Sequence, residues 1–180
     1  MPSRRHLRLG LSTLLLAALL AGCKGGSETE VLQRAATGLQ SADPKLRGEA
    51  VVQLKSLLQK KPGNAQARLL LASHLLATGD PNGAKADFQR ALEAGATPAE
   101  VLPKLARAML VTGQGALVVS QYGKESLGNA EADAQLKSVI ASAQMQQGHL
   151  DDAARTIEAA LRAAPGHPAA SQVQAQLAAA

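Results

Sequence analysis

Apolar residues and glycines recur along this 180-residue chain with a period of about 34 residues. The dipeptides Gly79-Asp80, Gly113-Gln114 and Gly148-His149 stand 34 and 35 residues apart. Between them, apolar positions follow the three- and four-residue spacing of amphipathic helices, which predicts a pair of helices in each period. The predicted helices span 28–42, 44–61, 64–78, 81–95, 98–112, 115–127, 130–147, 150–164 and 168–179.

Small and large apolar residues occupy fixed positions within each period. With Ala65 as position 1, Ala72 and Ala84 fall at positions 8 and 20, where small side chains let two helices approach closely. Larger apolar residues at positions 7, 11, 24 and 28 fill the space between neighbouring pairs, and the glycine at position 15 ends the first helix.

This pattern resembles the tetratricopeptide repeat (TPR). It predicts an all-α fold, a TPR-type α-solenoid of about four helix-turn-helix repeats. The repeats fill residues 28–167, as units 31–64, 65–98, 99–132 and 134–167, and a capping helix follows at 168–180.

Two features disturb the third unit. Gly115, Gly123 and Gly128 weaken the helix predicted at 115–127, because glycine is about 1 kcal/mol less favourable than alanine inside a helix. Pro103 lies one turn into the helix predicted at 98–112, and we expect it to kink that helix or delay its start.

The amino terminus has the layout of a bacterial lipoprotein signal peptide over residues 1–22. A positive segment with Arg4, Arg5 and Arg8 precedes an apolar stretch at 9–20, which is too short to span a bilayer. The sequence Leu-Ala-Gly-Cys then ends at Cys23, the sole cysteine of the chain. It resembles a lipobox, which implies that Cys23 is acylated and that residues 23–27 form a lipidated tether. Lys24 after the cysteine implies the outer membrane of a Gram-negative bacterium, facing the periplasm.

Composition excludes several other functions. Three of the 19 basic residues lie in the signal peptide, which leaves 16 basic against 14 acidic residues without clusters, so we expect no nucleic-acid binding. No catalytic or nucleotide-binding motif occurs, and His74, His149 and His167 are far apart. We therefore predict that the chain is no enzyme and takes no cofactor, metal or small-molecule substrate.

The first helices of successive TPR units line a concave groove through positions 2, 5, 9 and 12. In this chain the groove is predicted to consist of Gln66, Leu69, Ser73, Leu76, Glu100, Pro103, Arg107, Leu110, Gln135, Ser138, Ser142 and Met145. Apolar and small polar residues around one arginine suit an extended peptide or an amphipathic helix of a protein partner. The alternative is that Leu69, Leu76 and Leu110 only complete the core.

Several stretches together resemble the TPR lipoproteins of exosortase/PEP-CTERM exopolysaccharide gene clusters (the PrsT family). They are Leu-Leu-Ala-Gly-Cys at 19–23 and the segments at 50–60, 76–81 and 101–108. This chain would be a short or truncated relative of that family. The resemblance implies a periplasmic adaptor for exopolysaccharide export or PEP-CTERM protein sorting. A pilotin-like or outer-membrane-assembly lipoprotein uses the same parts and is the alternative.

The lipid anchor is directly testable. Replacing Cys23 by alanine removes the only thiol, so we expect an unprocessed precursor that takes up no palmitate analogue in metabolic labelling. Equal labelling of the wild type and Cys23→Ala would exclude acylation at this residue.

Overall fold

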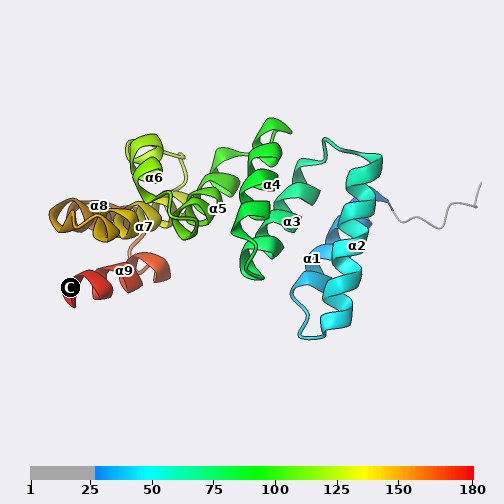
Figure 1. The fold of residues 1–180 in the computed structure, drawn as a ribbon, viewed down its shortest axis with the longest axis horizontal. Coiled ribbons are helices and arrows are strands. Elements are labelled where there is room, and N and C mark those ends of the chain that lie inside the picture. The colour runs from blue at the N-terminus through cyan, green and yellow to red at the C-terminus, as the bar shows by residue number, and fades with distance from the viewer. Residues whose placement is uncertain (1–26) are drawn as a thin grey trace, which may run out of the picture.

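The computed structural model describes residues 27–180, which form nine α-helices arranged in successive pairs along an elongated array (Figure 1). The helices are α1 (Glu28–Leu39), α2 (Pro44–Lys60), α3 (Ala65–Ala77), α4 (Pro81–Glu93), α5 (Pro98–Val111), α6 (Gly115–Tyr122), α7 (Ala130–Gln146), α8 (Leu150–Ala163) and α9 (Pro168–Ala178). The all-α solenoid predicted from the repeat is confirmed. The signal peptide and Cys23 lie outside the described residues. Within 27–180, no helix has the length and apolar character needed to cross a membrane.

Local sequence signals set where the helices begin and end. Ser27 starts α1 with a capping box, since its hydroxyl accepts the Glu30 amide at 3.3 Å and the Glu30 carboxylate accepts the Ser27 amide at 2.9 Å. Asp43 caps α2, since its side chain accepts the Lys45 amide at 2.8 Å, and Pro44 occupies the first helical position. The first helices of the later units end at Gly79, Gly113 and Gly148, whose positive φ angles of 88°, 77° and 78° favour glycine.

The two helices of a pair meet where small residues face each other. A Cβ atom built on Gly38 would lie 2.9 Å from the Cβ of Ala50, closer than side chains normally approach. Ala72 and Ala84 are completely buried in the second pair, and Ala141 and Ala153 are completely buried in the fourth. Positions 8 and 20 of the repeat therefore bring the paired helices into close contact.

Apolar side chains fill the core along the whole array in three clusters. The largest contains side chains from all five helices α3 to α7, among them Phe88, which is fully buried. A second joins α1, α2 and α3 around Leu54, and a third joins α7, α8 and α9 around Ile157. Val173 of α9 belongs to the third cluster, so the last helix covers the end of the array, as a capping helix would.

The third pair differs from its prediction. Helix α6 ends at Tyr122 rather than at residue 127, because Gly123 terminates it and the Leu127 amide donates to Asp133 Oδ1 of α7 at 2.9 Å instead of to a helical carbonyl.

Burial raises the pKa of Tyr122 above its ordinary value of 10.0, and the nearby Glu125 carboxylate raises it further.

The expected delay of α5 at Pro103 is also wrong. The helix begins at Pro98 and continues through Pro103, whose ring is fully buried. Its packing in the core offsets the backbone hydrogen bond that proline cannot donate.

Two glycines test the close approach of α1 and α2. Gly38→Ala should be destabilising, because the new methyl group collides with Ala50 and overpacking costs about 1–3 kcal/mol. Gly48→Ala, in the same pair but with nothing within 4 Å of its Cβ, should gain up to about 1 kcal/mol from helix propensity. Urea unfolding of dilute protein followed by circular dichroism measures both changes, and equal midpoints would contradict this account of the contact.

Helix α6 should be the least stable internal helix, since it has 8 residues where the other second helices have 13 to 17, and it packs less extensively on α5 than α4 packs on α3. Hydrogen exchange should therefore show the amides of α6 opening before those of α3 and α4. Equal protection in the three helices would refute this ranking.

Candidate functional site

The predicted groove positions have a regular pattern of exposure in the three units. Position 2 is exposed in each unit, as Gln66, Glu100 and Gln135. Position 5 is buried in each, as Leu69, Pro103 and Ser138. Position 12 is half-buried in each, as Leu76, Leu110 and Met145. The face that a partner can reach is thus made by positions 2, 9 and 12, whereas position 5 belongs to the core.

The alternative, that Leu69, Leu76 and Leu110 only complete the core, is therefore correct in part. Leu69 is a member of the central core cluster, and Leu76 and Leu110 pack against that cluster while remaining partly exposed. Met145 packs in the same way against the C-terminal cluster. These half-buried side chains contribute to the core and also present apolar surface along the first helices.

The serine hydroxyls of the predicted groove are bonded within their own helices. Ser73 Oγ donates to the Leu69 carbonyl at 2.7 Å, and Ser142 Oγ donates to the Ser138 carbonyl at 2.9 Å. Ser138 Oγ likewise donates to the Ala134 carbonyl at 2.7 Å. Because each proton is already used, Ser73 and Ser142 can offer a partner only an acceptor oxygen.

Helix α5 contributes two cations and one acid, Glu100, to this face. Arg107 is exposed and Lys104 is half-buried, and neither forms an ion pair with any carboxylate in residues 27–180. The only nearby acid of α5, Glu100, has its carboxylate engaged by the Thr97 hydroxyl at 2.8 Å. Arg107 and Lys104 are therefore available to bind a carboxylate at the middle of the face.

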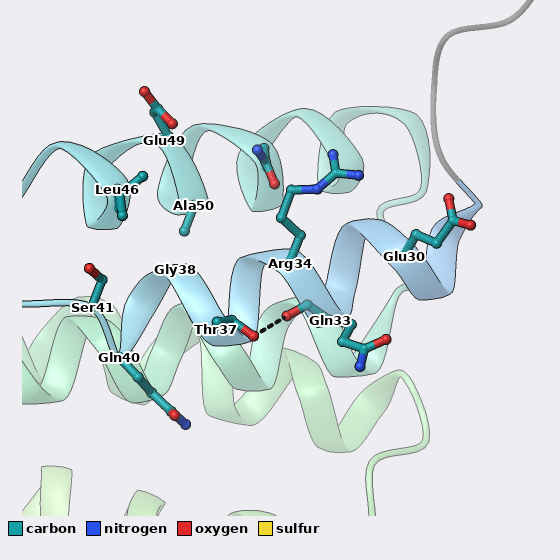
Figure 2. Close-up of a pocket in the computed structure, with 11 residues that line it drawn as sticks. Glu30, Gln33, Arg34, Thr37, Gly38, Gln40, Ser41, Leu46, Glu49 and Ala50 are labelled. Atoms are coloured by element: carbon teal, nitrogen blue, oxygen red, sulfur yellow. Dashed lines mark hydrogen bonds between the residues drawn. The ribbon is translucent and has the colours of Figure 1, made fainter. Parts of the chain in front are cut away.

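A separate groove of about 800 Å³ runs between α1 and α2 on the side away from α3 (Figure 2). Gly38 and Ala50 meet at its base, where they leave the groove deep because they have no side chain or only a methyl group. Sequence reasoning did not find this groove. It is lined by Glu30, Gln33, Arg34, Thr37, Gly38, Gln40, Ser41, Leu46, Glu49, Ala50 and Gln53.

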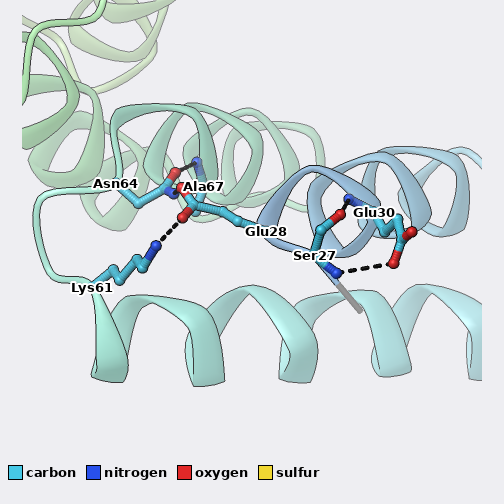
Figure 3. Close-up of polar contacts among 6 residues, drawn as sticks. All are labelled: Ser27, Glu28, Glu30, Lys61, Asn64 and Ala67. Carbon is cyan, nitrogen blue, oxygen red and sulfur yellow. Dashed lines mark hydrogen bonds and ion pairs between the residues drawn. The ribbon is translucent and has the colours of Figure 1, made fainter. Parts of the chain in front are cut away.

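A cluster of polar side chains joins the first pair of helices to the second (Figure 3). The Glu28 carboxylate of α1 accepts hydrogen bonds from Lys61, the last residue before the α2–α3 turn, and from the Asn64 side-chain amide. Asn64 in turn caps α3, because its Oδ1 accepts the Ala67 amide at 2.8 Å. Three helix ends are therefore fixed in one cluster, which sets how α1 lies on α3.

His167 and two acids of α8 lie at the starts of helices. His167 is buried at the start of α9, where Nδ1 accepts the Ala170 amide at 3.3 Å and Nε2 lies 3.2 Å from Glu131 Oε1. Asp151 and Asp152 lie in the first turn of α8, where acids favour the helix dipole. Within residues 27–180, no three His, Cys, Asp or Glu side chains are grouped as metal ligands.

Comparison with family models decides the family. Two tetratricopeptide-repeat models match residues 47–108 and 139–180, which together make up more than half of the chain. The chain is a tetratricopeptide-repeat protein. A search of the curated proteins found no match. The family models match the repeat itself, so the resemblance to the exopolysaccharide-cluster lipoproteins stays a prediction.

Solved TPR structures share the fold of this TPR protein. Two structures of MamA superpose with TM-scores of 0.60 and 0.56 at 18% and 19% identity, covering 83% and 71% of this chain and 79% and 74% of theirs. YrrB, described as a TPR protein with an unusual peptide-binding site, superposes with a TM-score of 0.54 at 21% identity, covering 80% of this chain and 73% of its own. At these identities the likeness concerns the fold.

The sequence of this TPR protein contains no direct signal for the α1–α2 groove, because the shape of the groove depends on how closely α1 and α2 approach each other at Gly38 and Ala50.

Proposed function

We propose that this TPR protein is an adaptor that binds an extended peptide or an amphipathic helix of a protein partner along the first helices α3, α5 and α7. The observation that carries the proposal is that position 2 is exposed and positions 9 and 12 are at least partly exposed in each of these helices, with Arg107 at the centre in no ion pair among residues 27–180. Side chains at a constant spacing on stacked helices suit a long ligand that contacts several units at once.

The chemistry of the face narrows the ligand. Leu76, Leu110 and Met145 offer partly exposed apolar contacts in three successive units. Arg107 and Lys104 favour an acidic group between those apolar contacts. A segment with apolar side chains on both sides of an Asp or Glu therefore fits the face best.

We further propose that Cys23 is acylated and holds the adaptor on the outer membrane, facing the periplasm of a Gram-negative bacterium. The lipobox-like sequence ending at Cys23 supports the anchor, and Lys24 supports the outer membrane. For the pathway we propose exopolysaccharide export or PEP-CTERM protein sorting, on the resemblance of the segments quoted above. Partners from a pilus or secretin system would replace that pathway with the pilotin-like alternative.

Charge reversal at Arg107 tests the adaptor proposal. Arg107→Glu should leave the helical circular dichroism signal and the melting temperature nearly unchanged, because the side chain is exposed and makes no ion pair within residues 27–180. It should weaken crosslinking to the native partner in the host about tenfold or more, since a carboxylate of the partner would now face a like charge.

The control is Arg162→Glu on α8, whose side chain is 72% exposed and whose pair with Glu158 is long, at 3.8 Å. This variant should keep full crosslinking, with the crosslinked proteins identified by mass spectrometry. Loss of crosslinking in Arg162→Glu, with retention in Arg107→Glu, would place the partner on the outer helices and overturn the proposal.

A further inference from the structure

One side of helix α5 remains open to solvent. Helices α3, α4, α6 and α7 pack against its other sides, and seven of its 14 residues are buried. The open side is formed by residues three or four positions apart, which share one side of a helix. In order along α5 they are Glu100, Lys104, Arg107 and Val111, at positions 2, 6, 9 and 13 of the repeat. Three of them are exposed and Lys104 is half-buried.

Val111 is an apolar residue that the fold does not use. It is 63% exposed and is the one exposed large apolar residue of α3, α5 and α7. It belongs to none of the three core clusters. The same position holds the small Ala77 in α3 and the polar Gln146 in α7. No contact within residues 27–180 therefore accounts for a valine here.

This valine is part of a larger apolar surface. It follows Leu110, which is half-buried and packs against the central core cluster. Position 12 is half-buried in α3 and α7 as well, as Leu76 and Met145. Val111 thus extends a row of partly exposed apolar side chains at the end of α5 where Arg107 lies one turn away.

The charges along the stripe favour an anion. Lys104 and Arg107 lie three residues apart, and neither forms an ion pair within residues 27–180. The carboxylate of Glu100 accepts the Thr97 hydroxyl at 2.8 Å and closes the capping box of α5. Helices α3 and α7 carry no charged residue at positions 2, 6, 9 and 13, which are Gln66, Leu70, Ser73, Ala77, Gln135, Val139, Ser142 and Gln146.

The helix sets the distance between the cations and the apolar end of the stripe. With a rise of about 1.5 Å per residue, the point midway between Lys104 and Arg107 lies about 8 Å along the axis from Val111. Two side chains of one ligand come closest to this spacing at residues i and i+2 of an extended segment, or i and i+4 of a helix.

We propose that the stripe on α5 is the central subsite of the partner-binding face and that Val111 anchors the ligand there. The ligand is a peptide segment with a carboxylate between Lys104 and Arg107 and, one turn along α5, an apolar side chain packed on Val111 and Leu110. The inference rests on the proposed adaptor function and adds which ligand side chains this protein distinguishes. A segment with the acid alone, or the apolar residue alone, binds less tightly.

A library of random peptides displayed on phage tests the subsite with the full-length protein in detergent. The enriched peptides should share an Asp or Glu with a Leu, Ile, Val, Met or Phe two or four residues away from it. Fluorescence anisotropy of a labelled synthetic copy then gives the Kd for each variant of the protein.

Val111→Ser should raise the Kd about tenfold, because the apolar contact is lost. The matched control is Val52→Ser, since Val52 is 66% exposed but belongs to α2, outside the partner-binding face. This control should leave the Kd unchanged. Both valines are exposed, so both variants should keep the circular dichroism spectrum of the wild type.

Changes in the peptide assign the two contacts. Replacing its apolar residue by serine should weaken binding to the wild type about tenfold and to Val111→Ser only slightly, because that contact is already absent. Replacing its acid by the neutral amide should likewise cost less with Arg107→Gln than with the wild type.

A library that yields no enriched peptide would overturn the subsite. So would enriched peptides that bind Val111→Ser as tightly as the wild type, or an apolar residue whose loss costs the same in both proteins. If such peptides still bind Arg107→Gln more weakly, the adaptor proposal stands and only the anchor at Val111 is wrong.

Discussion

The close approach of two helices at positions 8 and 20 is the contact on which the array depends. Gly38 against Ala50, Ala72 with Ala84, and Ala141 with Ala153 leave so little space between paired helices that each pair acts as one unit. Larger side chains such as Phe88 and Ile157 are then free to fill the spaces between successive helices. Since a single pair cannot bury these larger residues, the pairs must stack, and stacking aligns the first helices along one face.

The third pair shows what happens when this contact changes. Position 20 is occupied there by Val118, which is completely buried against a partner, Ala106, that is also completely buried. A β-branched side chain needs more room than alanine, so α6 packs less extensively on α5 and relies more on α7. Helix α6 is also short and ends early, and beyond it the Leu127 amide donates to Asp133 of α7.

Much of this fold is readable from the sequence because the repeat fixes both helix ends and buried positions. Glycine at position 15 and proline after an aspartate mark ends that agree with the structure within a few residues. The end of α6 was not readable, because the hydrogen bond from Leu127 to Asp133 depends on how α7 packs. The start of α5 was misjudged for a similar reason, since the burial of Pro103 in the core is a tertiary effect.

Only part of the candidate binding face on α3, α5 and α7 could be predicted from the sequence. Helical periodicity places positions 2, 5, 9 and 12 on one side of a helix, but it cannot tell which of them a neighbouring helix covers. The structure assigns position 5 to the core and leaves Arg107 exposed. Likewise, the groove beside α2 arises from the geometry at Gly38 and from the absence of a described helix over it, neither of which a linear pattern contains.

The central claim is that a partner lies along the first helices and not on the outer ones. Photocrosslinking in the native host tests it most directly, with a photoreactive amino acid placed at exposed Gln66 of α3 or Gln135 of α7, and at exposed Gln89 of α4 or Arg155 of α8 for comparison. The account predicts that the same partner is crosslinked from Gln66 and from Gln135 and not from the two outer positions. Crosslinking of that partner from Gln89 and Arg155 alone would contradict it.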